Sequence, residues 1–151
     1  MPAETRSLRL SDAPSVLLLH AVTSRTSALV ARALEGTGYR LDQWRVLDIV
    51  ARQRCIAMSA LAEAVPMPAP SLTRLVDRLV EDALLYRADD PGDRRRVLVH
   101  VSTRGEQVHQ RLAGFVAAAD AEALAALPPD DVARLRGLLQ RLSDALVAGE
   151  F

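Results

Sequence analysis

Three consecutive arginines, Arg94 to Arg96, follow a Pro-Gly-Asp turn sequence in the segment DDPGDRRR. Guanidinium groups are planar and permanently charged, so they suit phosphate oxygens and base edges. In an extended segment successive side chains alternate, so Arg94 and Arg96 point one way and Arg95 the other. We expect one set to contact DNA and the other to pair with Asp93 or Asp90. The sequence leaves open which set does which, and a merely solvated charged turn is the alternative.

A second group of polar side chains lies upstream, in the segment that begins SLTRLVDR. Ser71, Thr73 and Arg74 lie near its start, where a DNA-binding helix places the side chains that contact bases. Arginine can pair bidentately with guanine, whereas serine and threonine are short and unspecific donors. Arg78, one turn further, is better placed for a phosphate. In the alternative interpretation these two arginines only solvate the helix and pair with its acidic residues, Asp77, Glu81 and Asp82.

The spacing of apolar residues predicts the elements that must position these side chains. An amphipathic helix is expected over 71–85, because apolar residues recur on one face: Leu72, Leu75, Val76, Leu79 and Val80. The runs LLYRA and VLVHV then predict two short β-strands, with the Pro-Gly turn and the arginines at the tip between them. A polar-faced helix followed by a cation-tipped hairpin is what a winged helix-turn-helix requires. Its helix fills a major groove, and the wing reaches the next minor groove.

The rest of the chain predicts helices, and therefore a mainly α fold with a small β-hairpin wing. Residues 1–10 have no periodicity and are expected to form a loose arm. A helix over 13–35 is expected between the start signal Ser11-Asp12-Pro14 and the glycines Gly36 and Gly38. Two further helices are expected at 42–52 and 59–65, with a linker over 53–57 between them and a proline-containing turn after the second. Another helix is expected from a Thr103–Glu106 capping box to about 127, and the last one after Pro128-Pro129.

The helix expected over 13–35 is long for a chain of 151 residues, and its apolar residues cover more than one face. A helix of this kind requires a second surface to cover it. We therefore expect it to take part in dimerisation, and an ordinary long core helix is the alternative. The fifth and sixth helices can pack with it and with a symmetry mate.

The segment RLVDRLVEDALLYRADDPGDRRRVLVHVSTRG resembles the core of the MarR-type transcriptional regulators, and the wing pattern D-P-x-D-R-R carries most of this resemblance. LDQWRVLDIVAR also resembles the family's second helix, and the likeness extends from about Pro14 to about Leu146. It implies a dimeric winged helix-turn-helix repressor or activator that responds to small, often aromatic, molecules. It further implies one domain over 1–151: dimerisation helices at about 11–36 and 103–148 and a DNA-binding lobe at about 42–102.

The resemblance also implies roles in the wing. An arginine of the Asp93-Arg94-Arg95 motif would enter the minor groove, and Asp93 would hold the wing's geometry by pairing. The chain departs from the family just before Ser71, where Pro68-Ala69-Pro70 stands in place of polar or charged residues. Direct contacts to bases are therefore expected to be sparse, and recognition of DNA shape through the wing is expected to contribute more to binding.

Ligands in this family often bind between the dimerisation helices and the DNA-binding lobe, near the first and second helices. The candidates here are Trp44, the only tryptophan, and the polar residues His20, Ser24 and Arg25 of the first helix. An aromatic acid would need a ring to stack on and a cation, which Trp44 with Arg25 or His20 could supply. Alternatively, Trp44 is a core residue and His20 a hydrogen-bonded interior histidine.

Composition excludes several other classes. The 19 basic residues, all arginines, balance 19 acidic ones, so DNA binding has to depend on where the charges lie. The single cysteine, Cys55, excludes an internal disulfide and fits a reducing cytosol. It lies in the expected linker, where a redox role has no support. The three histidines, His20, His100 and His109, lack the spacing of a metal site. No enzyme motif, no cofactor signature and no membrane-spanning run occurs.

The sequence therefore predicts a cytoplasmic, homodimeric regulator that binds a pseudo-palindromic site in double-stranded DNA and is released by a small effector. No catalytic, cofactor or metal role is expected. The rival from another class is a module that uses the same fold to bind protein. Substituting Arg94 and Arg95 by alanine separates the two, because the rival makes both arginines dispensable for DNA.

Overall fold

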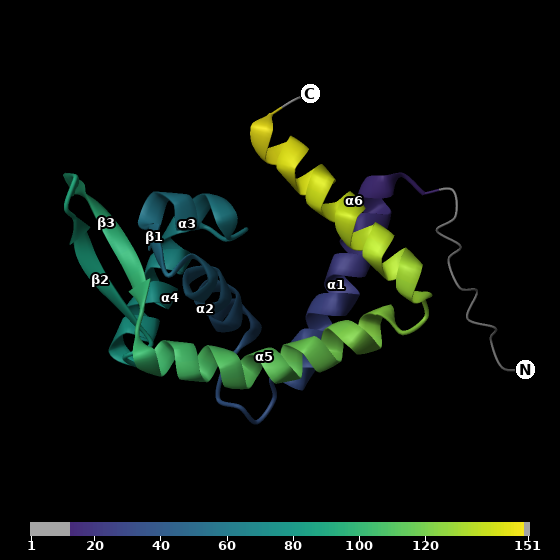
Figure 1. Cartoon of the computed structure of the whole chain (residues 1–151), viewed down its shortest axis with the longest axis horizontal. Coiled ribbons are helices and arrows are strands. Elements are labelled where there is room, and N and C mark those ends of the chain that lie inside the picture. The colour runs from purple at the N-terminus through teal and green to yellow at the C-terminus, as the bar shows by residue number, and fades with distance from the viewer. Residues whose placement is uncertain (1–12, 150–151) are drawn as a thin grey trace, which may run out of the picture.

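A computed structural model describes residues 13–149 as an arch (Figure 1). A lobe of helices and a small sheet forms one end, and a long helix runs from this lobe to the helices at the other end. The elements are α1 (Ser15–Ala33), α2 (Leu41–Gln53), β1 (Cys55–Ala57), α3 (Met58–Ala64), α4 (Ala69–Glu81), β2 (Leu85–Asp90), β3 (Asp93–Val101), α5 (Thr103–Leu124) and α6 (Pro129–Ala148). The predicted winged helix-turn-helix, mainly α with a small β-sheet, is confirmed. The N-terminal arm expected over 1–10, with Ser11 and Asp12, lies outside the described residues.

The hydrophobic core lies inside the lobe at the wing end of the arch. It joins α2, α3 and α4 to the sheet and to the first half of α5, and its fully buried members include Val46, Leu47, Val50, Leu61, Leu72, Val76, Leu79, Leu84, Val99 and Leu112. Each such side chain contributes about 1.5–3 kcal/mol relative to an exposed position. The apolar stripe predicted for α4 supplies three of them, so burial of this stripe fixes which face of α4 remains exposed.

Helix α4 is shifted toward the N-terminus relative to the predicted range. It begins at Ala69, with Pro68 as its N-cap residue and Pro70 in the first turn, where a missing N–H removes no helical hydrogen bond. It ends at Glu81, because Ala83 adopts a left-handed φ of 57° and the Leu84 N–H donates to the Leu79 carbonyl. An alanine stands where such caps usually have glycine, so no stop signal is recognisable in the sequence.

The sheet has three antiparallel strands in the order β1-β3-β2. The prediction that 53–57 is only a linker was wrong, because Cys55–Ala57 pairs with β3 and places Cys55 opposite His100. Three residues are too few to show an alternating pattern. The arginines also do not lie at the tip of the hairpin: β3 begins at Asp93, and the turn falls between Asp90 and Asp93.

The start of α5 differs from the predicted Thr103–Glu106 capping box. Ser102 is the N-cap residue, and its Oγ accepts a hydrogen bond of 2.9 Å from the Gly105 N–H. The same hydroxyl donates to the carbonyl of Ala83 at 2.7 Å. One serine therefore connects the end of α4 to the start of α5, and so connects the lobe to the long helix.

Helices α1 and α6 both lie at the end of the arch away from the wing, and neither contains a buried residue (Figure 1). Arg32 of α1 pairs with Glu122 of α5 at 3.0 Å, and Arg136 of α6 pairs with Asp120 of α5. Their large apolar side chains remain exposed: Val16, Leu17, Leu18, Leu19 and Val22 on α1, and Leu138, Leu139, Leu142, Leu146 and Val147 on α6. Nothing within residues 13–149 covers these faces.

No single helix of the described residues is long and apolar enough to cross a membrane. Helices α5 and α6 satisfy length and composition only when taken together, and they meet at an angle of 109°.

Candidate nucleic-acid interface

The exposed side of α4 separates two hollows. Ser71, Arg74 and Arg78 line one of them, of about 280 Å³, together with Arg40 and the start of α2; we call it the α2-side hollow. Thr73 and Asp77 line the other, of about 670 Å³, together with α3 and the wing strands; we call it the wing-side hollow. Helical spacing explains the division, because residues 71, 74 and 78 share one flank of α4 and residues 73 and 77 share the next.

Asp77 ties α4 to the wing. Its Oδ1 accepts a hydrogen bond of 2.6 Å from Nη1 of Arg87 on β2, and both side chains line the wing-side hollow. Asp77 therefore pairs with Arg87, and it does not neutralise Arg74 or Arg78 as the alternative interpretation expected. Arg74 and Arg78 are exposed, and neither forms an ion pair with another residue in the range 13–149.

The two aspartates of the wing turn bind its backbone. Oδ1 of Asp90 accepts from the Gly92 N–H at 2.8 Å, and Oδ1 of Asp93 accepts from the Arg95 N–H at 3.0 Å. Asp90 also pairs with Arg96, with 3.8 Å between Oδ2 and Nη1. Asp93 thus holds the turn through a backbone hydrogen bond, and among the described side chains Asp90 is the one that pairs with a wing arginine.

The wing arginines differ in their surroundings. Arg95 and Arg96 both line the wing-side hollow, and Arg96 is partly neutralised by Asp90. Arg95 is exposed and has no carboxylate within ion-pair distance in the part of the chain that the structure describes. The side chain of Arg94 lies outside the described part, and its two neighbours line the same hollow, so the alternation of faces stays a prediction.

The two hydroxyl groups at the start of α4 differ in how free they are to form hydrogen bonds with DNA bases. Thr73 Oγ1 donates to the Ala69 carbonyl at 3.0 Å, within its own helix. Its oxygen can still accept a hydrogen bond, as from an adenine or cytosine amino group. Ser71 is exposed on the other flank, beside Arg74.

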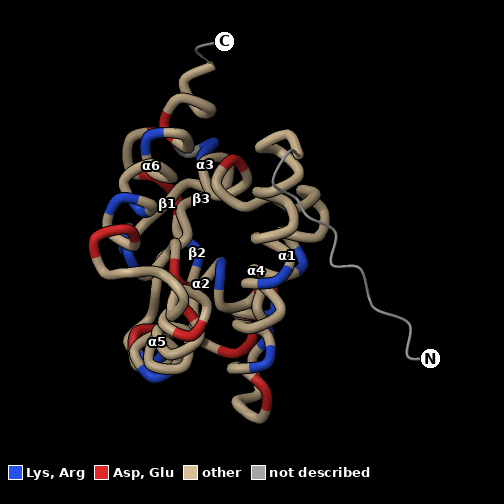
Figure 2. Tube along the Cα trace, turned by 90° about the vertical axis from the view of Figure 1, so that its right-hand side faces the viewer, with Lys and Arg blue, Asp and Glu red and all other residues tan. Residues whose placement is uncertain are grey.

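Charges of both signs are interspersed along the described part of the trace (Figure 2). This distribution agrees with the formal net charge of zero. A DNA-binding face consequently has to be defined by arginines that lack acidic partners, which is what α4 and the wing provide.

The effector candidates lie in two different environments. His20, Ser24 and Arg25 are all exposed on α1. Trp44 on α2 is buried, and its ring stacks on His109 of α5 with centroids 4.9 Å apart and planes 5° apart. Within one copy of the chain, the contact of the Trp44 ring is thus with α5, and the polar residues of α1 face outward.

The sequence raised only one role for His109, that of a metal ligand, and the spacing of the histidines did not support that role. Nε2 of His109 lies 2.8 Å from Oδ1 of Asp48, whose Oδ2 accepts a hydrogen bond of 2.8 Å from Nε of Arg52. The hydrogen bond and charge of Asp48 raise the pKa of Arg52 above its usual value, so this arginine remains charged. The i, i+4 spacing of Asp48 and Arg52 was visible in the sequence, whereas the partner from α5 was not.

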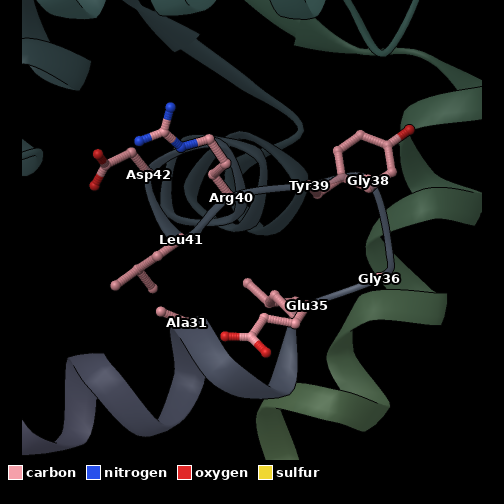
Figure 3. Close-up of a pocket in the computed structure, with 9 residues that line it drawn as sticks. Ala31, Glu35, Gly36, Gly38, Tyr39, Arg40, Leu41 and Asp42 are labelled. Carbon is pink, nitrogen blue, oxygen red and sulfur yellow. The ribbon is translucent and has the colours of Figure 1, made fainter.

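A further pocket of about 430 Å³ lies at the turn between α1 and α2 (Figure 3). Gly36 and Gly38 form this turn with φ angles of 76° and 84°. Ala31 faces it from α1 and Glu35 from the turn itself, whereas the guanidinium of Arg40 points away from them. None of the effector candidates lines this pocket.

Cys55 is half-buried, with its Sγ 3.6 Å from Nε2 of His100 on the neighbouring strand. The ring of His100 also stacks on Tyr86 of β2, with centroids 4.9 Å apart. No group of three or more potential metal ligands occurs among residues 13–149.

Sequence comparison finds relatives of this chain. A profile described as the MarR family matches residues 37–96, from the turn before α2 to the arginines of β3. The multiple antibiotic resistance protein MarR of Escherichia coli is 30% identical over 129 residues, which cover 83% of this chain and 88% of that protein. The protein of the same name from Salmonella typhimurium is 29% identical over the same shares of both chains.

Solved structures show the same fold. A mutant of Escherichia coli MarR complexed with operator DNA is 28% identical, with a TM-score of 0.75 over 90% of this chain and 98% of that one. A MarR-family transcriptional regulator from a Rhodococcus species, also 28% identical, has a TM-score of 0.81 over 90% of this chain and 96% of that one.

Proposed function

Because the chain belongs to the MarR family of DNA-binding transcription regulators, we propose that it is a homodimeric repressor of a pseudo-palindromic operator, released by a small effector. Members of this family regulate transcription and are not enzymes. The observation that carries the proposal is the exposed flank of α4, which presents arginines without acidic partners beside a wing that α4 holds through Asp77 and Arg87. Because its target is DNA, the protein acts in the cytoplasm.

Contacts to DNA follow from the two flanks of α4. With α4 in a major groove, Ser71, Thr73 and Arg74 lie on the turn that meets base edges, and Arg78 lies one turn further, near a phosphate. The wing arginines extend toward the adjacent minor groove. Asp93 shapes the wing by accepting from the Arg95 N–H, which supports a role for Arg94, Arg95 or Arg96 in that groove.

Homodimerisation accounts for the uncovered apolar faces of α1 and α6. The apolar faces of α1 and α6 include ten large exposed side chains, such as Leu17 and Leu142, in a chain whose remaining core is well buried. Soluble proteins rarely leave contiguous apolar surface of this kind uncovered. We assign the helices at about 11–36 and 103–148 to the dimer interface, and the two-fold symmetry then matches two half-sites about 10 bp apart.

An effector would bind where the dimer helices meet the DNA-binding lobe. His20, Ser24 and Arg25 are open in one copy of the chain, so a second copy would be needed to enclose them. A small aromatic acid could pair with Arg25, whereas Trp44 would have to leave His109 to stack on it. A coupling of about 1–3 kcal/mol between the sites is enough to weaken operator binding about 5- to 150-fold.

Footprinting on the DNA that flanks the protein's own gene tests the proposal. We expect two protected half-sites, about 10 bp apart and related by an approximate dyad. Adding candidate aromatic acids should remove the protection at the concentration at which they bind. A ligand that binds the protein and leaves the footprint unchanged would remove the release mechanism, and no footprint on any duplex would favour a protein-binding module.

A further inference from the structure

The α2-side hollow collects three arginines from two separate elements. Arg74 and Arg78 come from α4, one turn apart on its exposed flank, and Arg40 comes from the residue just before α2. The α4 pair belongs to the helix that faces DNA, whereas Arg40 lies 34 positions earlier than Arg74 in the sequence. Nothing in the sequence pattern of the wing or of α4 indicates Arg40, because only the fold brings it to this flank.

The charges in the hollow are unbalanced. None of the three arginines forms an ion pair with a residue between 13 and 149. Asp42 is the single acidic residue of the lining, and its Oδ1 already pairs with Nη1 of Arg45 at 3.3 Å. Guanidinium groups that share a hollow repel one another unless an anion lies between them. The hollow is therefore suited to an anionic oxygen group.

The position of Arg40 is fixed by its backbone. Its N–H donates a hydrogen bond of 2.8 Å to Oε1 of Gln43, which anchors the residue at the first turn of α2. The guanidinium points away from Ala31 and Glu35, and so away from the acidic side of the α1–α2 turn (Figure 3). Arg40 also lines the α2-side hollow.

A helix in the major groove has a phosphate backbone on each side. The groove is about 12 Å wide and a helix with its side chains about 10–12 Å across, so both flanks of α4 lie near phosphates. The wing-side hollow, with Arg95, faces one strand, and the α2-side hollow opens on the opposite flank of α4. DNA bound to α4 therefore places a phosphate within reach of the second hollow.

We propose that Arg40, together with Arg78, binds a DNA backbone phosphate in the α2-side hollow and anchors α4 from the side opposite the wing. The proposal rests on the proposed DNA-binding function and adds a binding residue to it. A phosphate contact fixes the orientation of the helix without adding sequence preference. Arg40 should consequently act equally on operator DNA and on unrelated DNA.

The salt dependence of binding tests this role directly. The full-length dimer and its Arg40→Gln variant are titrated onto fluorescent duplexes at several salt concentrations, with one duplex from the DNA flanking its own gene and one shuffled duplex. Removing one phosphate interaction per subunit lowers the slope of log K against log salt by about 1.8 for the dimer. Binding to both duplexes should weaken by the same factor.

Two further variants serve as controls. Arg40→Lys keeps the charge and should keep most of the slope, although a lysine lacks the bidentate geometry. Arg111→Gln removes an exposed arginine of α5 that lies outside the hollow, and it should leave the slope unchanged. A thermal unfolding curve for each variant establishes that α2 remains folded.

An Arg40→Gln variant that is folded and keeps the wild-type slope overturns the phosphate role. A slope change confined to the flanking duplex would contradict it as well, because it would indicate contact with bases. Failure of the wild-type protein to bind either duplex would instead overturn the proposed DNA-binding function itself. This outcome is distinguishable from loss of the phosphate role, because it is seen in the protein that still has Arg40.

Discussion

The indole ring of Trp44 lies parallel to the imidazole of His109, 4.9 Å away, and His109 in turn contacts Asp48 at 2.8 Å. Trp44 and Asp48 belong to α2, inside the lobe, whereas His109 belongs to α5, which runs to the other end of the arch. The contact is therefore a physical link between the two ends of the arch. A change in the angle of α5 has to move α2 or break this contact.

Replacing His109 by alanine should loosen that link. The variant lacks the aromatic stacking and the hydrogen bond, which together stabilise the fold by about 1–3 kcal/mol. Urea unfolding at fixed protein concentration measures the decrease in stability. Gln110→Ala, at the exposed neighbouring position, should change stability far less. Equal stability of the two variants would show that the stacked pair contributes nothing.

Gly105 is expected to tolerate no side chain. A Cβ there would collide with the carbonyl oxygen of Leu84, at the point where the end of α4 meets the start of α5. Gly105→Ala should cost at least about 3 kcal/mol or prevent folding, because backbone has to move.

Gly114→Ala is the matched control for that variant. Gly114 lies on the same helix, and an added Cβ meets nothing within 4 Å. Higher helix propensity should stabilise this variant by up to about 1 kcal/mol. Similar unfolding midpoints for the two variants would mean that the close approach at Leu84 is absent in solution.

Placing a charge on the outer face of α6 should separate the proposed dimer. Leu142→Glu removes one apolar side chain from each copy, about 2 kcal/mol each, and adds two carboxylates to the interface. The dissociation constant should rise at least about a thousandfold. Light scattering after size exclusion gives the mass, and Ser143→Glu, the adjacent exposed residue, should remain dimeric. A dimer that persists in Leu142→Glu would place the interface elsewhere.

The double variant Arg94→Ala with Arg95→Ala tests the wing. Removal of each phosphate interaction should reduce the slope of log K against log salt by about 0.9. Arg111→Ala again provides a comparison that changes charge away from the wing. An unchanged slope in the double variant would show that the wing does not bind phosphates.

The sequence predicted the parts of this protein that depend on local pattern. The stripe of Leu72, Val76 and Leu79 has helical spacing, and the prolines before Ser71 mark a helix start, so α4 was recognisable. The wing was recognisable because Pro91-Gly92 lies between two apolar runs. Both patterns involve residues near one another in the chain.

What the sequence did not predict depends on contacts between distant segments or on unusual backbone. Strand β1 exists because β3 offers an edge to Cys55–Ala57, and nothing in three residues indicates that edge. Helix α4 stops early because Ala83 takes a left-handed conformation that usually requires glycine. Arg40 joins Arg74 and Arg78, and His109 joins Asp48, only through the packing of α2 against α4 and α5.

The most direct test of the central claim is an anisotropy titration of the wild-type protein on the DNA flanking its own gene, against a shuffled duplex, at two salt concentrations. A sequence-specific regulator should bind the flanking DNA at least about a thousandfold more tightly than the shuffled duplex. Both affinities should fall steeply with salt. Equal, weak and salt-independent binding to both duplexes would contradict the claim that this protein recognises DNA.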